Sequence, residues 1–220
     1  MPEDVQDASA ELIKSLNGLQ RITVQAMRGT VMDLRCLEPN GTCLKDLRLW
    51  SNYEEETTYY SAEDLGQLKL ICPLLEQLSV TLGGLSLTVD DIGLNEAFRL
   101  ANNTDYVQKL KTLAQHNGLH LIELADPSLL INDYSANERR LLYTEVANQI
   151  LQQLAHNGSE VQHLRFMPVY DYPNVDEDED GHAWPRYVFE SGTVLVDRNG
   201  RQELIKTTAV PNPQNIPKKR

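Results

Sequence analysis

The sequence has no stretch near the roughly 18 consecutive apolar residues that a bilayer-spanning helix needs. Its first residues, Met1 to Asp7, are acidic where a secretory signal would be basic and then apolar. Basic residues are also few, since 20 Lys and Arg stand against 32 Asp and Glu and give a formal net charge of -12. Such a charge disfavours nucleic acid or an anionic membrane as the main partner. These absences predict a cytoplasmic or nuclear protein.

Signatures of catalysis and of metal binding are missing as well. The three cysteines, Cys36, Cys43 and Cys72, are odd in number and lack a paired metal spacing, which is typical of reduced, structural thiols. The acidic run Asp176–Gly181 matches the first half of a calcium loop, but Tyr187 stands at the twelfth position, where a bidentate Glu is needed. No Gly-x-Ser-x-Gly nucleophile motif occurs. We therefore expect no catalytic residue, metal or cofactor, and no enzymatic activity.

The chain does have four Asn-Gly pairs that each precede a short segment with apolar residues at strand spacing: Asn17-Gly18, Asn40-Gly41, Asn117-Gly118 and Asn157-Gly158. At least three of them follow a stretch of helical periodicity. A helix commonly ends in a left-handed residue, which Gly adopts freely and Asn tolerates. The recurring order of helix, Asn-Gly and strand predicts an α/β solenoid, in which repeated units stack and share one core.

An Asn-Gly pair is also the commonest tight hairpin turn, and we adopt that interpretation for Asn199-Gly200. Apolar residues alternate on both sides of this pair, so Thr193–Asp197 and Gln202–Thr207 are predicted to form a terminal β-hairpin. Prolines argue against regular structure near the C-terminus. The predicted organisation is a solenoid over 1–170, an acidic loop and hairpin over 171–210, and a disordered tail over 211–220.

Four segments share one spacing of apolar residues: Leu19–Val24, Leu44–Leu49, Leu75–Val80 and Val161–Phe166. In each, apolar residues stand at the first, fourth and sixth positions. Leu119–Leu124 is interpreted as an irregular fifth segment, with Leu119, Leu121 and Leu124 as its apolar positions. We expect these segments to form parallel strands on one face, with the connecting helices on the other face.

Residues between the apolar positions should point outward from the strands and form the partner-binding surface. Solenoids bind partners on such extended faces, and exposed Trp and Arg are frequent interface hot spots. The predicted binding residues are Lys45, Arg48, Trp50, Glu76, Gln77, Ser79, Glu123, Gln162, His163 and Arg165.

The L-x-x-L-x-L spacing resembles the conserved half of leucine-rich repeats, and Cys72–Val80 (CPLLEQLSV) is similar to the C-P-x-L-x-x-L form in the repeats of F-box proteins. The long helical stretch that ends at Ile150–Ala155, with Met167–Tyr170 and Gly181–Tyr187 beyond it, resembles the tail of fungal F-box and leucine-rich-repeat proteins. In that family an N-terminal F-box docks on a cullin-type ubiquitin ligase, and the repeats hold a substrate. Nothing before Ala8 could supply an F-box.

The sequence thus predicts a non-catalytic protein-interaction module with a protein partner on its strand face. The resemblance implies the substrate-recognition repeats of an F-box-type ubiquitin ligase adaptor, with the ligase core as a partner only if a longer form carries an F-box. The alternative is a compact α/β enzyme of unidentified chemistry, because its strands and helices would give a similar coarse pattern.

Overall fold

The computed structural model describes residues 3–26, 31–51, 59–83, 85–87, 100, 103–125, 128–129, 136–167, 187–192, 194–196, 202–205 and 207–211. The helices are α1 (Glu3–Ser15), the 3-10 helix η1 (Leu34–Asn40), α2 (Ala62–Ile71), α4 (Thr104–Ala114) and α5 (Ala136–His156). The strands are β1 (Arg21–Ala26), β2 (Asp46–Ser51), β3 (Gln77–Val80), β4 (Ser86–Leu87), β5 (Leu121–Ala125), β6 (Ser128–Leu129), β7 (His163–Met167), β8 (Tyr187–Glu190), β9 (Val194–Val196), β10 (Gln202–Ile205) and β11 (Thr208–Pro211).

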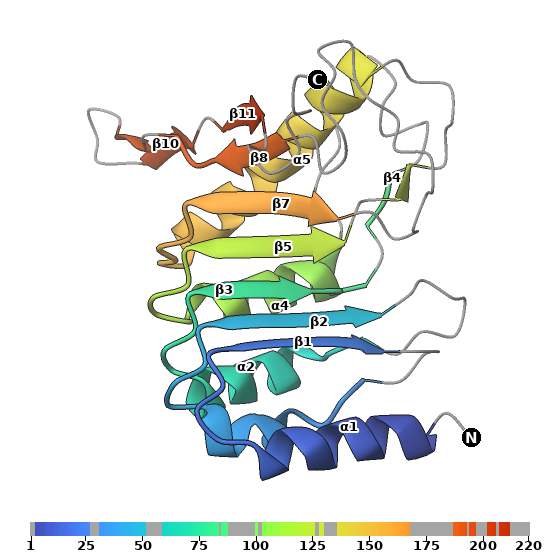
Figure 1. The fold of residues 1–220 in the computed structure, drawn as a ribbon. Coiled ribbons are helices and arrows are strands. Elements are labelled where there is room, and N and C mark those ends of the chain that lie inside the picture. Colours follow the sequence, from blue (N-terminus) through green and yellow to red (C-terminus); the bar gives the residue numbers. More distant parts are fainter. Residues whose placement is uncertain are drawn as a thin grey trace, which may run out of the picture.

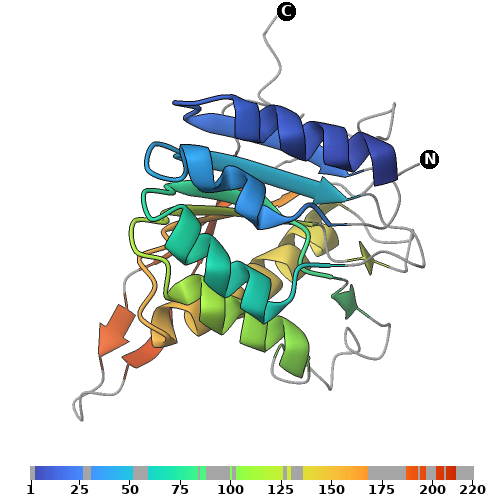
Figure 2. The ribbon, with the colours of Figure 1, turned by 90° about the horizontal axis from the view of Figure 1, so that it is seen from below.

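One seven-stranded sheet, in the order β1-β2-β3-β5-β7-β8-β11, organises the molecule. Its first five strands run parallel and follow the order of the chain, whereas β8 and β11 are antiparallel additions at one edge. Helices α2, α4 and α5 lie behind the sheet in Figure 1, and the view from below separates the two layers (Figure 2). The predicted α/β class, with a largely parallel sheet and helices, is confirmed.

The register of the parallel strands aligns the predicted segments. Ile22 pairs with Leu47, Leu47 with Leu78, Leu78 with Ile122, and Ile122 with Leu164. The fifth segment is therefore regular, because Ile122 occupies the position that the sequence analysis gave to Leu121. Leu121 instead lies one residue earlier in the register, opposite Gln77. The interpretation of this segment as irregular was wrong.

The backbone enters each new strand in the same way. The carbonyl oxygen of Gln20 accepts hydrogen bonds from the amides of Lys45 and Asp46, at 2.9 and 3.0 Å. Lys45, Glu76 and His120 repeat the arrangement, since each carbonyl accepts from two consecutive amides of the next segment. Four successive junctions thus share one geometry, which agrees with the register in which the apolar side chains pack.

The core lies between the sheet and the helices. Leu47, Leu78, Ile122 and Leu164 form its buried row on the strands. The predicted helical stripes supply the other side, with Leu110 and Leu113 of α4 and with Val146, Ile150, Leu151 and Leu154 of α5 all buried. Three leucines that stand at helical spacing in the sequence, Leu12 of α1, Leu16 just after α1 and Leu141 of α5, are instead exposed.

Three of the four Asn-Gly pairs end a helix as predicted. Gly18, Gly118 and Gly158 follow α1, α4 and α5, and their φ angles of 79°, 85° and 85° are left-handed. Gly41 follows η1 but has a φ of -58°, so the left-handed explanation is wrong there. A Cβ at Gly41 would lie 1.9 Å from the carbonyl oxygen of Ile71, the last residue of α2. Glycine is required at this position because the end of α2 occupies the space of a side chain.

Asn40, the residue before Gly41, is fully buried and ties two units together. Its Nδ2 donates to the carbonyl oxygens of Ile13 and Leu16, at 3.2 and 3.0 Å, and its Oδ1 accepts from the amide of Leu19 at 2.9 Å. These groups lie at the end of α1 and the start of the next segment, where a helix leaves carbonyls without intrahelical partners. The amide side chain therefore caps α1 from the following unit.

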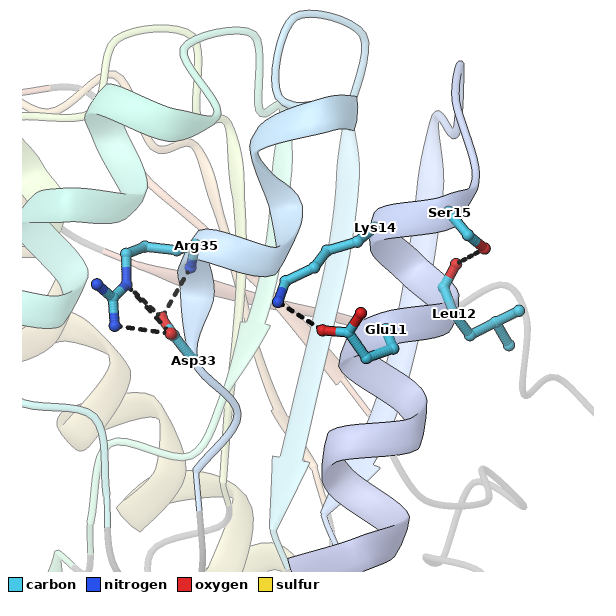
Figure 3. A network of polar contacts seen from close by, with 6 residues as sticks. All are labelled: Glu11, Leu12, Lys14, Ser15, Asp33 and Arg35. Atoms are coloured by element: carbon cyan, nitrogen blue, oxygen red, sulfur yellow. Dashed lines mark hydrogen bonds and ion pairs between the residues drawn. The ribbon is translucent and has the colours of Figure 1, made fainter.

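Short-range ion pairs lie on the helical side of the first units. Asp33 caps the start of η1, because its side chain accepts from the Arg35 amide at 3.0 Å and also pairs with the Arg35 guanidinium. Lys14 and Glu11 pair at 2.7 Å along α1. Figure 3 shows the two pairs side by side, with α1 next to η1.

The C-terminal part closes the sheet with antiparallel strands. The predicted hairpin is confirmed, because β9 and β10 pair antiparallel in a small sheet of their own. Phe166 of β7 contacts Tyr143 of α5 and Phe189 of β8, with ring centroids 5.6 and 5.5 Å apart, and so joins the three elements. Strands β8 and β11 were not predicted from the sequence. The acidic run Asp176–Gly181 and residues 212–220 lie outside the described residues.

Candidate functional site

The side of the sheet away from the helices carries rows of polar side chains, and we call it the strand face. One row runs through Thr23, Arg48, Ser79, Glu123 and Arg165, which are neighbours in the register of β1, β2, β3, β5 and β7. These positions alternate with the buried apolar rows along each strand, as side chains of a strand must. In Figure 1 this face is turned toward the viewer, with α2, α4 and α5 behind it.

The middle of the strand face is a buried polar network rather than a free surface. The Glu123 carboxylate accepts from the Ser79 hydroxyl through Oε2 and from Arg165 Nη1 through Oε1, the latter at 2.9 Å. Ser79 is 2% exposed and Glu123 is 5% exposed. Both were predicted as partner-binding residues, but their side chains contact each other and leave little surface for a partner.

A second network lies at the start of the sheet. Asp46 is buried and sits between two arginines, with Arg21 Nε 2.6 Å from its Oδ2 and Arg48 Nε 3.3 Å from its Oδ1. Arg21 is largely exposed, and Arg48 is partly exposed. The predicted set contained Arg48 but missed Arg21. The sequence could have indicated Arg21, because Arg21 stands directly before the apolar residue Ile22, and Asp46 stands directly before the equivalent apolar residue Leu47.

The remaining predicted residues are more accessible. Lys45 and Glu76 pair at 2.6 Å, and the hydrogen bond and charge of Lys45 lower the pKa of Glu76. Gln77 and Trp50 are partly exposed, and Gln162 is exposed. His163 Nε2 lies 3.9 Å from Glu190 Oε1 of β8. The structure therefore brings all ten predicted residues to one sheet, on β2, β3, β5 and β7 or just before them.

Two of the three cysteines, Cys36 and Cys72, are poorly suited to nucleophilic chemistry. Cys36 and Cys72 are fully buried, and burial raises the pKa of Cys36 to about 11 and that of Cys72 to about 12. A thiol acts as a nucleophile or metal ligand in its thiolate form, which is scarce at such pKa values. Among the described residues, no group of three or more His, Cys, Asp or Glu side chains could hold a metal ion.

One titratable group is buried away from the strand face, at the turn between α4 and β5. His116 is 2% exposed, and neither ring nitrogen makes a hydrogen bond of good geometry. Burial lowers the pKa of His116, and nearby backbone groups of Asn117 and Cys72 offset only part of this effect. The native protein thus holds His116 in its neutral form.

We predict that this histidine makes the fold sensitive to acid. Its folded pKa lies below the unfolded value of about 6.5, so the unfolded chain binds the extra proton and stability falls as pH drops below about 6.5. Urea unfolding at about pH 7.5 and pH 5.5 should show a smaller acid-induced loss of stability for His116→Leu than for the wild type. His156→Gln, at an exposed position, is the control. Equal losses in all three proteins would contradict the prediction.

Comparisons with protein-family models, curated proteins and solved structures each gave no significant match. Within the part of the chain that the structure describes, no helix combines the length and apolar character needed to cross a membrane.

Proposed function

We propose that this chain is a non-catalytic protein-interaction module, built as an irregular leucine-rich-repeat-like solenoid, that binds a protein partner on its strand face in the cytoplasm or nucleus. Its more specific form is the substrate-recognition repeat region of an F-box-type ubiquitin ligase adaptor. This specific form is supported by the resemblance of Cys72–Val80 to the repeats of that family and by the resemblance of Ile150–Ala155, Met167–Tyr170 and Gly181–Tyr187 to its tail.

The observation that carries the general proposal is the translational repetition of the sheet. Five parallel strands follow chain order, and four successive junctions share the same pair of backbone hydrogen bonds. Units that repeat by translation build an extended face instead of a closed cleft, and extended faces suit large partners such as proteins.

The partner should contact the accessible residues of the strand face. Lys45, Gln77, Gln162 and His163 are exposed or partly exposed and do not belong to the two buried networks. Ser79, Glu123 and Arg165 act beneath them as a rigid support. A binding test should therefore change the accessible residues and leave the support intact, because loss of the support would abolish binding through unfolding alone.

The test is affinity purification of the tagged protein from its native cells, followed by mass spectrometry. The strand-face variant carries Lys45→Ala, Gln77→Ala, Gln162→Ala and His163→Ala. The matched control carries Arg35→Ala, Gln67→Ala, Gln108→Ala and Lys111→Ala, four exposed polar positions on the helices. Both variants should unfold in urea much as the wild type does.

We expect at least one protein to bind the wild type and the control but to be lost from the strand-face variant. Ligase subunits among the proteins lost would support the F-box link. Recovery of the same proteins by all three forms would contradict the strand face as the binding surface, and an activity screen for the α/β enzyme alternative would then follow.

A further inference from the structure

Positive charges on one part of the strand face are matched by nearby carboxylates, whereas another part has more positive than negative side chains. Elsewhere on the strand face each described lysine or arginine lies beside a carboxylate: Lys45 pairs with Glu76, and Arg165 pairs with Glu123. Among the described residues of β1 and β2, by contrast, one carboxylate, that of Asp46, lies beside two guanidinium groups, those of Arg21 and Arg48. Because arginine stays protonated at physiological pH, this cluster keeps a net charge of +1 in a chain whose formal net charge is -12.

The two arginines also retain free donors. Each points its Nε toward Asp46, and no hydrogen bond from their Nη groups is found within the described residues. A guanidinium carries five N–H donors in one plane. Two of these donors can form parallel hydrogen bonds to the two oxygens of a carboxylate. Asp46 forms an ion pair with both guanidinium groups, which come from neighbouring strands about 4.8 Å apart.

An aromatic side chain lies beside this cluster. Trp50 stands two residues after Arg48 on the same strand, so both side chains leave the same face, and Trp50 is partly exposed. Trp and Arg together are the residue types most enriched among interface hot spots. We call Arg21, Arg48 and Trp50 the β1–β2 corner.

We infer that the β1–β2 corner receives a glutamate or aspartate side chain from a short acidic segment of the protein partner. This inference rests on the proposed function and names the chemistry of its partner. The carboxylate would lie on the two guanidinium forks, and an apolar neighbour in the segment would pack on Trp50. The net charge of -12 disfavours long polyanions, so a short acidic segment fits better than a nucleic acid or a membrane.

The direct test uses two capped peptides, one with two glutamates flanking a phenylalanine and one with glutamines in their place. Binding is followed at low ionic strength by the indole N–H signal of Trp50 in the ¹⁵N-labelled protein, which Trp50→Phe assigns against Trp184. We expect the glutamate peptide to shift this signal and to bind at least tenfold more tightly than the glutamine peptide. Equal affinities, or an equal response to inorganic phosphate, would overturn the acidic-segment inference.

A neutralised corner is the matching protein variant. The triple variant Arg21→Gln, Asp46→Asn and Arg48→Gln removes the net charge without leaving a buried carboxylate unpaired, and it should lose at least tenfold in affinity for the glutamate peptide. If it does not fold, Arg21→Lys with Arg48→Lys keeps the charge, removes the forks and should still bind severalfold less tightly. The control is Arg35→Gln, an exposed arginine of η1 that also pairs with an aspartate. Unchanged affinity in the folded corner variant would overturn the inference.

Affinity purification with the corner variant tests this inference independently of the proposed function. A partner that is lost from both the corner variant and the strand-face variant supports the two proposals together. A partner that the corner variant keeps and the strand-face variant loses leaves the proposed function standing and overturns the corner. A partner that both variants keep overturns both.

Discussion

Replacing Gly41 with alanine is expected to lower the free energy of unfolding by about 4 kcal/mol, a loss in the range that marks a specific structural cause. The new Cβ would lie 1.9 Å from the Ile71 carbonyl oxygen and 2.9 Å from its carbonyl carbon. Both atoms belong to the backbone at the end of α2, so relief requires that η1 and α2 move apart. Because η1 precedes β2 and α2 follows it, the substitution should disturb the packing of two helices rather than one turn.

Gly158→Ala is the matched control, because Gly158 also belongs to an Asn-Gly pair. A Cβ at Gly158 would meet no atom within 4 Å, and its φ of 85° would cost about 1 kcal/mol. Urea unfolding of the two variants therefore separates lack of space from backbone strain. If Gly41→Ala were no more destabilising than Gly158→Ala, the close approach of η1 to the end of α2 would be wrong.

The strands could be predicted from the sequence because each repeats a strong local pattern. Apolar residues at a fixed spacing mark both the start of a strand and its buried side; an Asn-Gly pair precedes them at β1, β2, β5 and β7, and Cys72-Pro73 precedes them at β3. The pattern failed at Leu119–Leu124, where Leu121 looked like the conserved leucine and Ile122 was overlooked. Strands β8 and β11 carry no such marker, and their place in the sheet depends on long-range pairing that one sequence does not reveal.

The location of the candidate site could be predicted, but its electrostatics could not. Alternation along a strand shows that Ser79 and Glu123 leave the face opposite the leucines. It does not show that the register sets Glu123 between Ser79 and Arg165, where the three side chains bind one another. Burial of these residues follows from contacts across strands that are far apart in sequence.

Arg165→Met is expected to lower the free energy of unfolding by about 4 kcal/mol. The Glu123 carboxylate would keep the Ser79 hydroxyl as a donor but lose its cation, and a buried charge left without its partner typically costs 3–5 kcal/mol, roughly. Methionine preserves most of the apolar volume of the arginine stem, so the loss reports on charge more than on packing. The measurement is urea unfolding at neutral pH.

The double variant Glu123→Gln with Arg165→Met should recover most of this loss, because it leaves no buried charge. Arg35→Met, which breaks the exposed pair with Asp33, should change stability little. Equal losses in the single and double variants would show that Arg165 contributes by packing and would remove the case for a rigid charged support under the strand face. If instead the double variant is stable and still binds the partner, Glu123 and Arg165 hold the surface in place while Lys45, Gln77, Gln162 and His163 make the contact.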